Sequence, residues 1–218
     1  MDVLSKFRRR KKITRYNQYK NDFFNKLNFP FQKGKKILDV GCGPATDAPI
    51  FKKEYGLSYY GTDVYKDDNL KKQKISFKLG GIFKIPYPTE SFDYVFVHDV
   101  LHHIDEPDHL EIKHLAGLKE LKRVCKRGGE IVIVEGNRYN PLFYPHMVLM
   151  RGHEHFAHAY FLEIIKKTFK KDEICFKFFE AHFYPPRALK FWKFYEFFME
   201  KFVPRQFRAY NAAVIKVR

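Results

Sequence analysis

The sequence predicts an α/β fold built on a mostly parallel, doubly wound sheet, and three observations carry that prediction. The apolar run that begins at Ile37 breaks after Val40 into the turn Gly41-Cys42-Gly43, as a buried strand followed by a tight turn would. A second strand-like segment ends at Asp63, 20 residues after the second glycine. Further short apolar runs then alternate with helical segments, which favours a parallel sheet with right-handed crossovers.

The remaining elements follow from local patterns. We expect strands near 36–40, 58–62, 75–79, 93–98 and 130–135, and a terminal strand at 210–217 with an antiparallel partner near 174–180. Amphipathic spacing predicts a helix from Ile13 to Leu27. Proline and acids at 105–107 predict the start of a helix that runs through Leu121, and Cys125 is also expected to be helical. Gly128-Gly129 is expected to close the connection to the next strand.

Length and composition indicate one globular domain. The chain has 218 residues, 45% of them hydrophobic, which is enough for a sizeable core and excludes a disordered chain. We divide it into a basic leader and cap helix (1–34), a binding core (35–137), a variable region (138–205) and a terminal strand (206–218). Its three cysteines have no disulfide or zinc spacing. No apolar run is long enough to cross a bilayer and the amino terminus lacks a signal-peptide pattern, so we expect a cytoplasmic protein, with peripheral membrane contact left open.

The formal net charge of +16 leaves three explanations open. It fits a solvated basic surface, a nucleic-acid partner, or an anionic membrane surface, where each basic residue contributes about 1 kcal/mol. Between Pro186 and Pro204, aromatic residues at helical spacing predict a helix. We expect it to cap the sheet or to line the substrate pocket, and the alternatives are a helix in a membrane interface or a surface that stacks single-stranded RNA bases.

Three ordered segments resemble one family. They are Ile37–Asp47 (ILDVGCGPATD), Ile85–Val97 (IPYPTESFDYVFV) and Leu118–Ile133 (LKELKRVCKRGGEIVI). Together they are similar to class I S-adenosylmethionine-dependent methyltransferases, in the subgroup that includes ubiquinone- and menaquinone-pathway enzymes. The resemblance implies a Rossmann-like, seven-stranded, mostly parallel sheet with an antiparallel last strand and helices on both faces. The turn lacks the third glycine of a dinucleotide site, which disfavours pyrophosphate and favours a ligand with adenosine alone.

The resemblance also implies the residues that bind the cofactor, S-adenosylmethionine. Asp39, Gly41 and Gly43 are expected to face its methionine portion, Asp63 its ribose, and His98 to lie under the methionine. The full predicted set is Asp39, Gly41, Cys42, Gly43, Asp63, Val64, Gly81, Ile82 and His98. Gly81 stands where the family usually has an acid that binds the adenine amino group, so a backbone contact from Gly81 and Ile82 is expected instead. The cap helix could bring Arg15, Tyr16 or Tyr19 to the ligand.

Two histidine groups supply candidates for a general base. They lie at 98–103 and 153–158, and the predicted catalytic candidates are His102, His103, His153 and Glu154, with His155 beside them. Methyl transfer needs few such groups, because aligning the reactants supplies most of the rate. We predict no metal site, since the three imidazoles of the second group do not share one helical face.

The predicted function is in-line methyl transfer to oxygen or carbon of a small or lipid-like acceptor, with the variable region forming the acceptor pocket. RNA methylation is a second possibility that the charge favours and the motifs do not. A third is a catalytically inactive cofactor-binding partner of another methyltransferase, which the glycine at position 81 favours.

Overall fold

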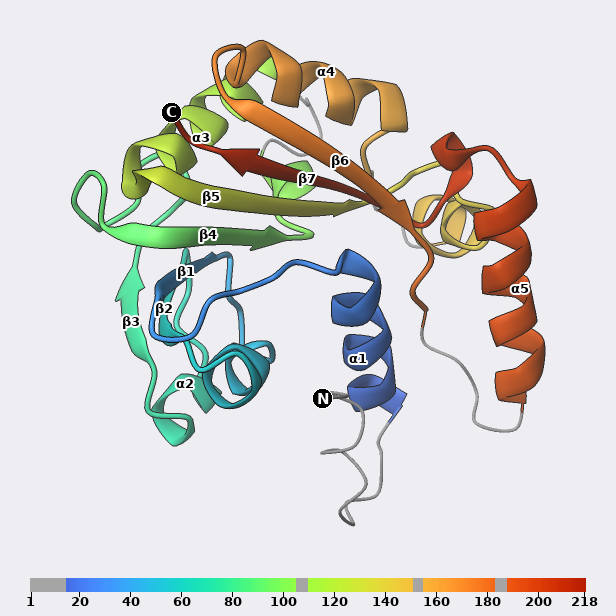
Figure 1. Cartoon of the computed structure of the whole chain (residues 1–218), viewed down its shortest axis with the longest axis horizontal. Helices are drawn as coiled ribbons and strands as arrows, with labels where there is room; N and C mark the ends of the chain where they lie inside the picture. The colour runs from blue at the N-terminus through green and yellow to red at the C-terminus, as the bar shows by residue number, and fades with distance from the viewer. Residues whose placement is uncertain (1–14, 105–109, 151–154, 183–187) are drawn as a thin grey trace.

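The protein folds around one seven-stranded sheet of order β3-β2-β1-β4-β5-β7-β6 (Figure 1). This computed structural model describes residues 15–104, 110–150, 155–182 and 188–218. The strands are β1 (Lys36–Val40), β2 (Ser58–Asp63), β3 (Ser76–Leu79), β4 (Phe92–His98), β5 (Cys125–Gly136), β6 (Glu173–Phe179) and β7 (Tyr210–Lys216). The α-helices are α1 (Arg15–Leu27), α2 (Asn69–Lys72), α3 (Glu111–Val124), α4 (His158–Thr168) and α5 (Leu189–Phe202). Shorter helical turns cover Ile50–Glu54, Leu101–His103, Tyr144–Leu149 and Arg205–Phe207.

The pairing of the strands confirms the predicted fold class. Strands β1 to β5 pair in parallel, whereas β7 runs antiparallel to both β5 and β6. The order reverses between β1 and β4, the central pair, and ligands of open α/β sheets bind at the carboxyl ends of strands beside such a reversal.

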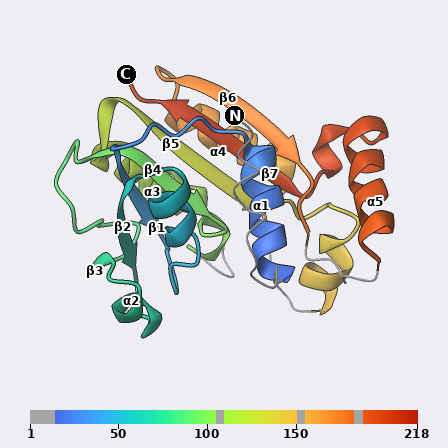
Figure 2. The same cartoon turned by 60° about the horizontal axis from the view of Figure 1, so that its bottom comes forward.

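Alternate residues of the central strands supply two halves of the core. On one face, Phe96 of β4 packs with aromatic side chains of α1, among them Phe24. On the other face, Val95 and Val97 pack with apolar residues of α3 and α4. Helices therefore cover both faces, as predicted, and α1 lies on the side opposite α3 and α4 (Figures 1 and 2).

Helix α5 buries a polar residue and exposes most of its aromatic ones, the reverse of what is expected of an amphipathic helix. Its buried positions include Glu196, which pairs with Lys26 of α1 at 2.9 Å and with Lys193 at 3.1 Å. Its phenylalanines face outward instead, and Phe194 is 64% exposed. The prediction that this aromatic stripe packs on the sheet is therefore wrong, because ion pairs with α1 hold the polar side of the helix inward.

Helix α3 corrects a predicted boundary. Leu110 is extended and precedes the first helical residue, Glu111, so the helix does not start at 105–107; residues 105–109 themselves lie outside the described part of the chain. The buried spacing of the helix continues through Val124, after which Cys125 is already the first residue of β5 and not helical. The predicted glycine pair, 128–129, lies inside β5, beside an irregularity in its pairing with β4.

The described helices differ from membrane-spanning helices. None of them combines the length and the apolar character that crossing a membrane requires.

Candidate cofactor and acceptor sites

The backbone of the glycine turn after β1 is fixed by hydrogen bonds and by steric contacts. The amide groups of Gly41 and Cys42 both donate to the carbonyl oxygen of Thr62, at 2.8 and 3.2 Å. Gly41 has a φ of +74°, and a Cβ atom there would lie 2.4 Å from Cγ2 of Val100. Only glycine satisfies both the dihedral and the space at this position.

Asp63 ends β2 beside this turn. Its Oδ2 atom accepts a 2.7 Å hydrogen bond from the amide of Gly43, and only 8% of the residue is exposed. The bond ties the acid to the turn across 20 residues of sequence and fixes the carboxylate at the sheet edge.

A cavity of about 510 Å³ opens above the turn, and we call it the glycine-turn cavity. Its lining is Val40, Gly41, Gly43, Asp63, Val64, Tyr65, Gly80, Gly81, Ile82, Phe83, Asp99, Val100, His103 and Ile104. Six of the nine residues predicted for the cofactor, namely Gly41, Gly43, Asp63, Val64, Gly81 and Ile82, therefore lie around one space, with His103 at its rim.

The other three predicted cofactor residues do not line this cavity. Asp39 is buried in β1, where the hydroxyl of Tyr59 donates to its Oδ2 atom at 2.6 Å. Burial, and next the negative charge of Asp47, raise the pKa of Asp39 to about 7. The sulfur of Cys42 packs against Gly61, where a Cβ atom would lie only 2.8 Å from it.

His98, the third of them, belongs to a buried charge cluster beneath α1. Its ring stacks on Phe23 with centroids 4.3 Å apart. Its Nδ1 lies 3.6 Å from Asp47, which in turn pairs with Lys20 at 2.6 Å. Burial alone would raise the pKa of Asp47, but the charges of Lys20 and His98 outweigh it and lower that pKa.

A second cavity, of about 560 Å³, lies between α1, α5 and the ends of β4 and β7, and we call it the aromatic cavity. Its lining is Tyr19, Asp99, Leu142, Phe143, His146, Met147, His155, His182, Trp192 and Tyr210. Most of these residues come from the region that the sequence assigns to the acceptor. Tyr19, one of the three cap-helix candidates, is among them, and its hydroxyl lies 2.6 Å from that of Tyr210.

Asp99 lines both cavities. It follows the last residue of β4 and has a φ of +53°, which is uncommon outside glycine. Its Oδ1 accepts a 2.8 Å hydrogen bond from the amide of Gly136, and its Oδ2 lies 3.3 Å from Nε2 of His98. Burial opposes ionisation of Asp99, but the neighbouring imidazoles His98, His102 and His155 lower its pKa overall.

The predicted catalytic candidates are divided by the structure. His102 is buried, and its Nδ1 lies 2.6 Å from Oε2 of Glu135, whereas His103 faces the glycine-turn cavity. His153 and Glu154 lie outside the described residues. Their neighbour His155 is buried in the wall of the aromatic cavity, with its ring centroid 4.4 Å from that of His102.

Comparison with known proteins agrees with this arrangement. A family model described as "Methyltransferase domain" matches residues 38–133. A demethylmenaquinone methyltransferase of a Geobacillus species is 30% identical over 168 residues, which are 72% of this chain and 65% of that protein. The chain has the fold of the class I S-adenosylmethionine-dependent methyltransferases and is similar in sequence to methyltransferases. The matched segment contains most of β1 and of β5 together with β2, β3, β4 and α3, and so contains the whole lining of the glycine-turn cavity.

Two further methyltransferases show the breadth of the similarity. An uncharacterized methyltransferase of Schizosaccharomyces pombe is 37% identical over 130 residues, which are 52% of this chain and 44% of that protein. The crystal structure of an S-adenosylmethionine-dependent methyltransferase from Archaeoglobus fulgidus has a TM-score of 0.65 at 17% identity, and the match covers 94% of this chain and 95% of that one. The chain spans 44% and 65% of the length of the two curated relatives.

Sequence reasoning missed Asp99 and Glu135 as site residues. Both stand at the carboxyl ends of neighbouring parallel strands, where side chains of doubly wound sheets meet ligands, and that position was the available signal. Their partners could not be read from spacing, because Glu135 meets a histidine 33 residues away.

Proposed function

We propose that this protein transfers a methyl group from S-adenosylmethionine to a small, largely apolar acceptor. One observation carries the proposal: Asp99 belongs to the walls of both cavities, so ligands in the two cavities meet at this residue. In-line transfer requires that meeting, and holding two reactants together can supply an effective molarity of about 10⁵–10⁸ M.

The glycine-turn cavity suits the cofactor. Asp63 presents a buried carboxylate that can accept hydrogen bonds from both ribose hydroxyls, and the turn at Gly41 lets a ligand approach the backbone. Val64 and Phe83 are both at least half exposed beside Ile82. They offer apolar walls to an adenine ring, where the family usually has an acid. When bound, the cofactor supplies an activated methyl group on a sulfonium.

The aromatic cavity suits an acceptor with a flat or apolar body and one polar end. Phe143, Trp192 and Met147 supply apolar wall, while the hydroxyls of Tyr19 and Tyr210 and the carboxylate of Asp99 supply polar atoms. Small-molecule sites are usually lined by apolar side chains with a small number of polar groups among them. The similarity to demethylmenaquinone methyltransferases supports an acceptor of this kind.

The outward phenylalanines of α5 support a lipid-like acceptor taken from an anionic membrane surface. Phe191, Phe194, Phe197, Phe198 and Phe202 are each 45% exposed or more. Trp192, between them in sequence, lines the aromatic cavity, so the same helix reaches both the cavity and the solvent. A net charge of +16 adds attraction to anionic lipid headgroups. Peripheral attachment to the cytoplasmic face of a membrane follows from this proposal.

Calorimetric titration with S-adenosylmethionine and S-adenosylhomocysteine tests the cofactor half. We expect saturable binding that Asp63→Ala weakens by about 10-fold or more, as loss of a hydrogen bond to a charged group does. Asp68→Ala, an exposed acid five residues on, is the matched control and should bind normally. Absence of binding to the folded wild-type protein would refute the proposal.

Incubation with radiolabelled S-adenosylmethionine tests the acceptor half. Hydroxylated aromatic compounds, with and without an isoprenoid tail, are presented in vesicles of anionic lipid, and RNA is presented in parallel. The net charge favours RNA as the second candidate acceptor, and label in RNA alone would select it. Cofactor binding without label in any fraction would favour the inactive partner protein.

A further inference from the structure

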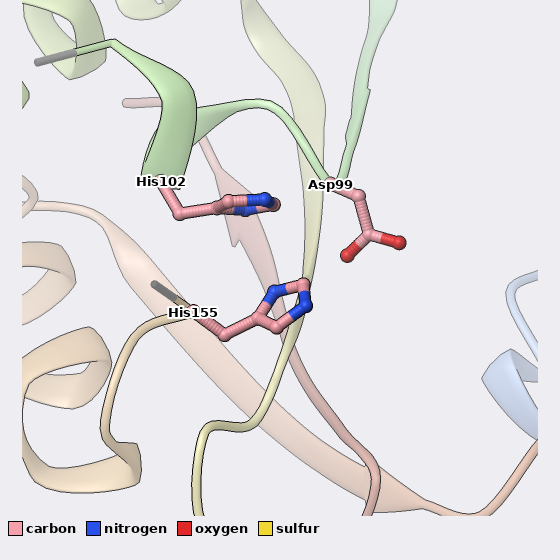
Figure 3. Close-up of side chains that lie close together, drawn as sticks. All are labelled: Asp99, His102 and His155. Carbon is pink, nitrogen blue, oxygen red and sulfur yellow. The ribbon is translucent and has the colours of Figure 1, made fainter. Parts of the chain in front are cut away.

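We propose that a divalent transition-metal ion binds Asp99, His102 and His155 at the boundary between the two cavities. One possible ligand atom from each of the three residues lies within 4.8 Å of the others. Figure 3 shows the carboxylate and the two imidazole rings close together, with Asp99 and His102 on the segment after β4 and His155 on the segment before α4. Two imidazoles and one carboxylate are a common donor set for such ions.

His155 gives the strongest indication of a missing ligand. It is 7% exposed, and neither of its ring nitrogens has a hydrogen-bond partner among the residues that the structure describes. A buried polar group without a partner is costly, and an ion bound to one nitrogen would remove part of that cost.

His102 is oriented as metal-binding histidines usually are. Glu135 is fully buried, and its Oε2 lies 2.6 Å from Nδ1 of His102. Its other oxygen accepts hydrogen bonds from the amides of Val100 and Leu101, at 3.0 and 2.7 Å, which fixes the carboxylate. A carboxylate behind an imidazole sets its tautomer and raises its basicity.

The backbone leaves space for this cluster. Gly136, the last residue of β5, donates its amide hydrogen to Asp99, and a Cβ atom on it would lie 2.9 Å from Nδ1 of His155. Asp99 itself holds a positive φ at the strand end. Strained residues of this kind persist where the surroundings fix them, often at functional sites.

The donor set selects the class of ion. Imidazole ligands suit zinc and its neighbours, whereas magnesium and calcium prefer oxygen ligands throughout. Three protein ligands leave a coordination position for a further group. Because Asp99 and His155 line the aromatic cavity, that position would face an oxygen atom of the acceptor, and this role rests on the proposed function. The spacing of His153, His155 and His158 predicts no metal site, because the proposed partners of His155 lie more than 50 residues earlier in the chain.

Zinc and cobalt titrations of the full-length, chelator-treated protein test the inference. We expect one ion per chain by equilibrium dialysis and elemental analysis, and visible d–d absorption bands when Co²⁺ binds. His155→Ala should abolish stoichiometric binding, and Glu135→Gln should weaken it by about 10–100-fold, as loss of a supporting carboxylate does. His146→Ala removes another histidine of the same cavity and should bind the ion normally.

Thermal melting confirms that each variant folds before the titration is interpreted. No stoichiometric Zn²⁺ binding by the wild-type protein, or binding that His155→Ala leaves unchanged, would overturn the inference. Binding of S-adenosylhomocysteine is measured separately on the same samples. If the wild-type protein does not bind S-adenosylhomocysteine, that result counts against the proposed function alone, because ion binding is measured without cofactor or acceptor.

Discussion

The hydroxyl of Tyr59 on β2 donates a 2.6 Å hydrogen bond to Oδ2 of Asp39 on β1, directly below the glycine turn. This bond and the charge of Lys20 favour the ionised carboxylate, but burial and the charge of Asp47 outweigh them. The pKa of Asp39 is therefore raised to about 7, so the carboxyl holds a proton at mildly acidic pH in the folded protein.

Asp39→Asn should flatten the pH dependence of stability. The folded protein holds the proton between about pH 4 and pH 7 and the unfolded chain does not, so this group favours folding most below pH 4. That contribution is lost as the pH rises through 7 and amounts to roughly 2–4 kcal/mol. Urea unfolding of wild type and variant at pH 5 and pH 8 measures it. An unchanged difference between the two pH values in Asp39→Asn, relative to the exposed control Asp68→Asn, would contradict the assignment.

Lys20→Met should destabilise the protein by removing the partner of a buried acid. Lys20 and Asp47 are each about 7% exposed at the side chain and lie 2.6 Å apart. Loss of one partner from a buried pair costs about 3–5 kcal/mol, because the other charge stays buried. The double variant Lys20→Met/Asp47→Asn removes both charges and should recover part of that loss in a denaturant titration. Equal stability of the single and double variants would mean that Asp47 finds another counter-charge.

Gly41→Ala should weaken cofactor binding through the shape of the turn. The added methyl would meet Val100 at 2.4 Å and would also strain a φ of +74°. Gly34→Ala is a matched control, since Gly34 has a φ of +84° but open space around the position of a Cβ atom. Both variants should lose about 1 kcal/mol or more from backbone strain. Only Gly41→Ala should also weaken S-adenosylhomocysteine binding in calorimetry, and equal binding by the two variants would refute the steric account.

Glu196→Gln should lower the stability of the protein, whereas Phe194→Gln should lower its membrane binding and leave stability nearly unchanged. Glu196 is buried between two lysines, so its neutralisation should cost about 1–3 kcal/mol and loosen α5 in limited proteolysis. Phe194 is mostly exposed, so its replacement should change stability by no more than about 0.5 kcal/mol. Phe194→Gln should nevertheless reduce sedimentation with anionic vesicles. Unreduced sedimentation would count against the membrane-facing role of this helix.

The sheet could be predicted because its signals are local. Each strand is a short apolar run, and the glycine turn and Asp63 mark two strand ends within 27 residues, from Ile37 to Asp63. The antiparallel terminal strand needed the family resemblance as well, since an apolar run does not state its direction. The boundary of α3 was misjudged because proline and acids at 105–107 imitate a helix start that the backbone places at Glu111.

The orientation of α5 and the histidine cluster could not be predicted, for a shared reason. Each depends on a partner that is distant in sequence. Glu196 faces inward because it pairs with Lys26 of α1, which lies 170 residues earlier in the sequence. His102 and His155 meet because β4 and the segment before α4 end at the same edge of the sheet. Periodicity within one segment carries no information about either meeting.

Asp99 stands in the walls of both cavities, and this position has a thermodynamic consequence. A ligand that shifts or recharges this carboxylate from one side alters the affinity on the other side. By linkage, the factor by which an acceptor changes cofactor affinity equals the factor by which the cofactor changes acceptor affinity. Calorimetric titrations of each ligand in the presence and absence of the other should therefore give one coupling factor of equal size.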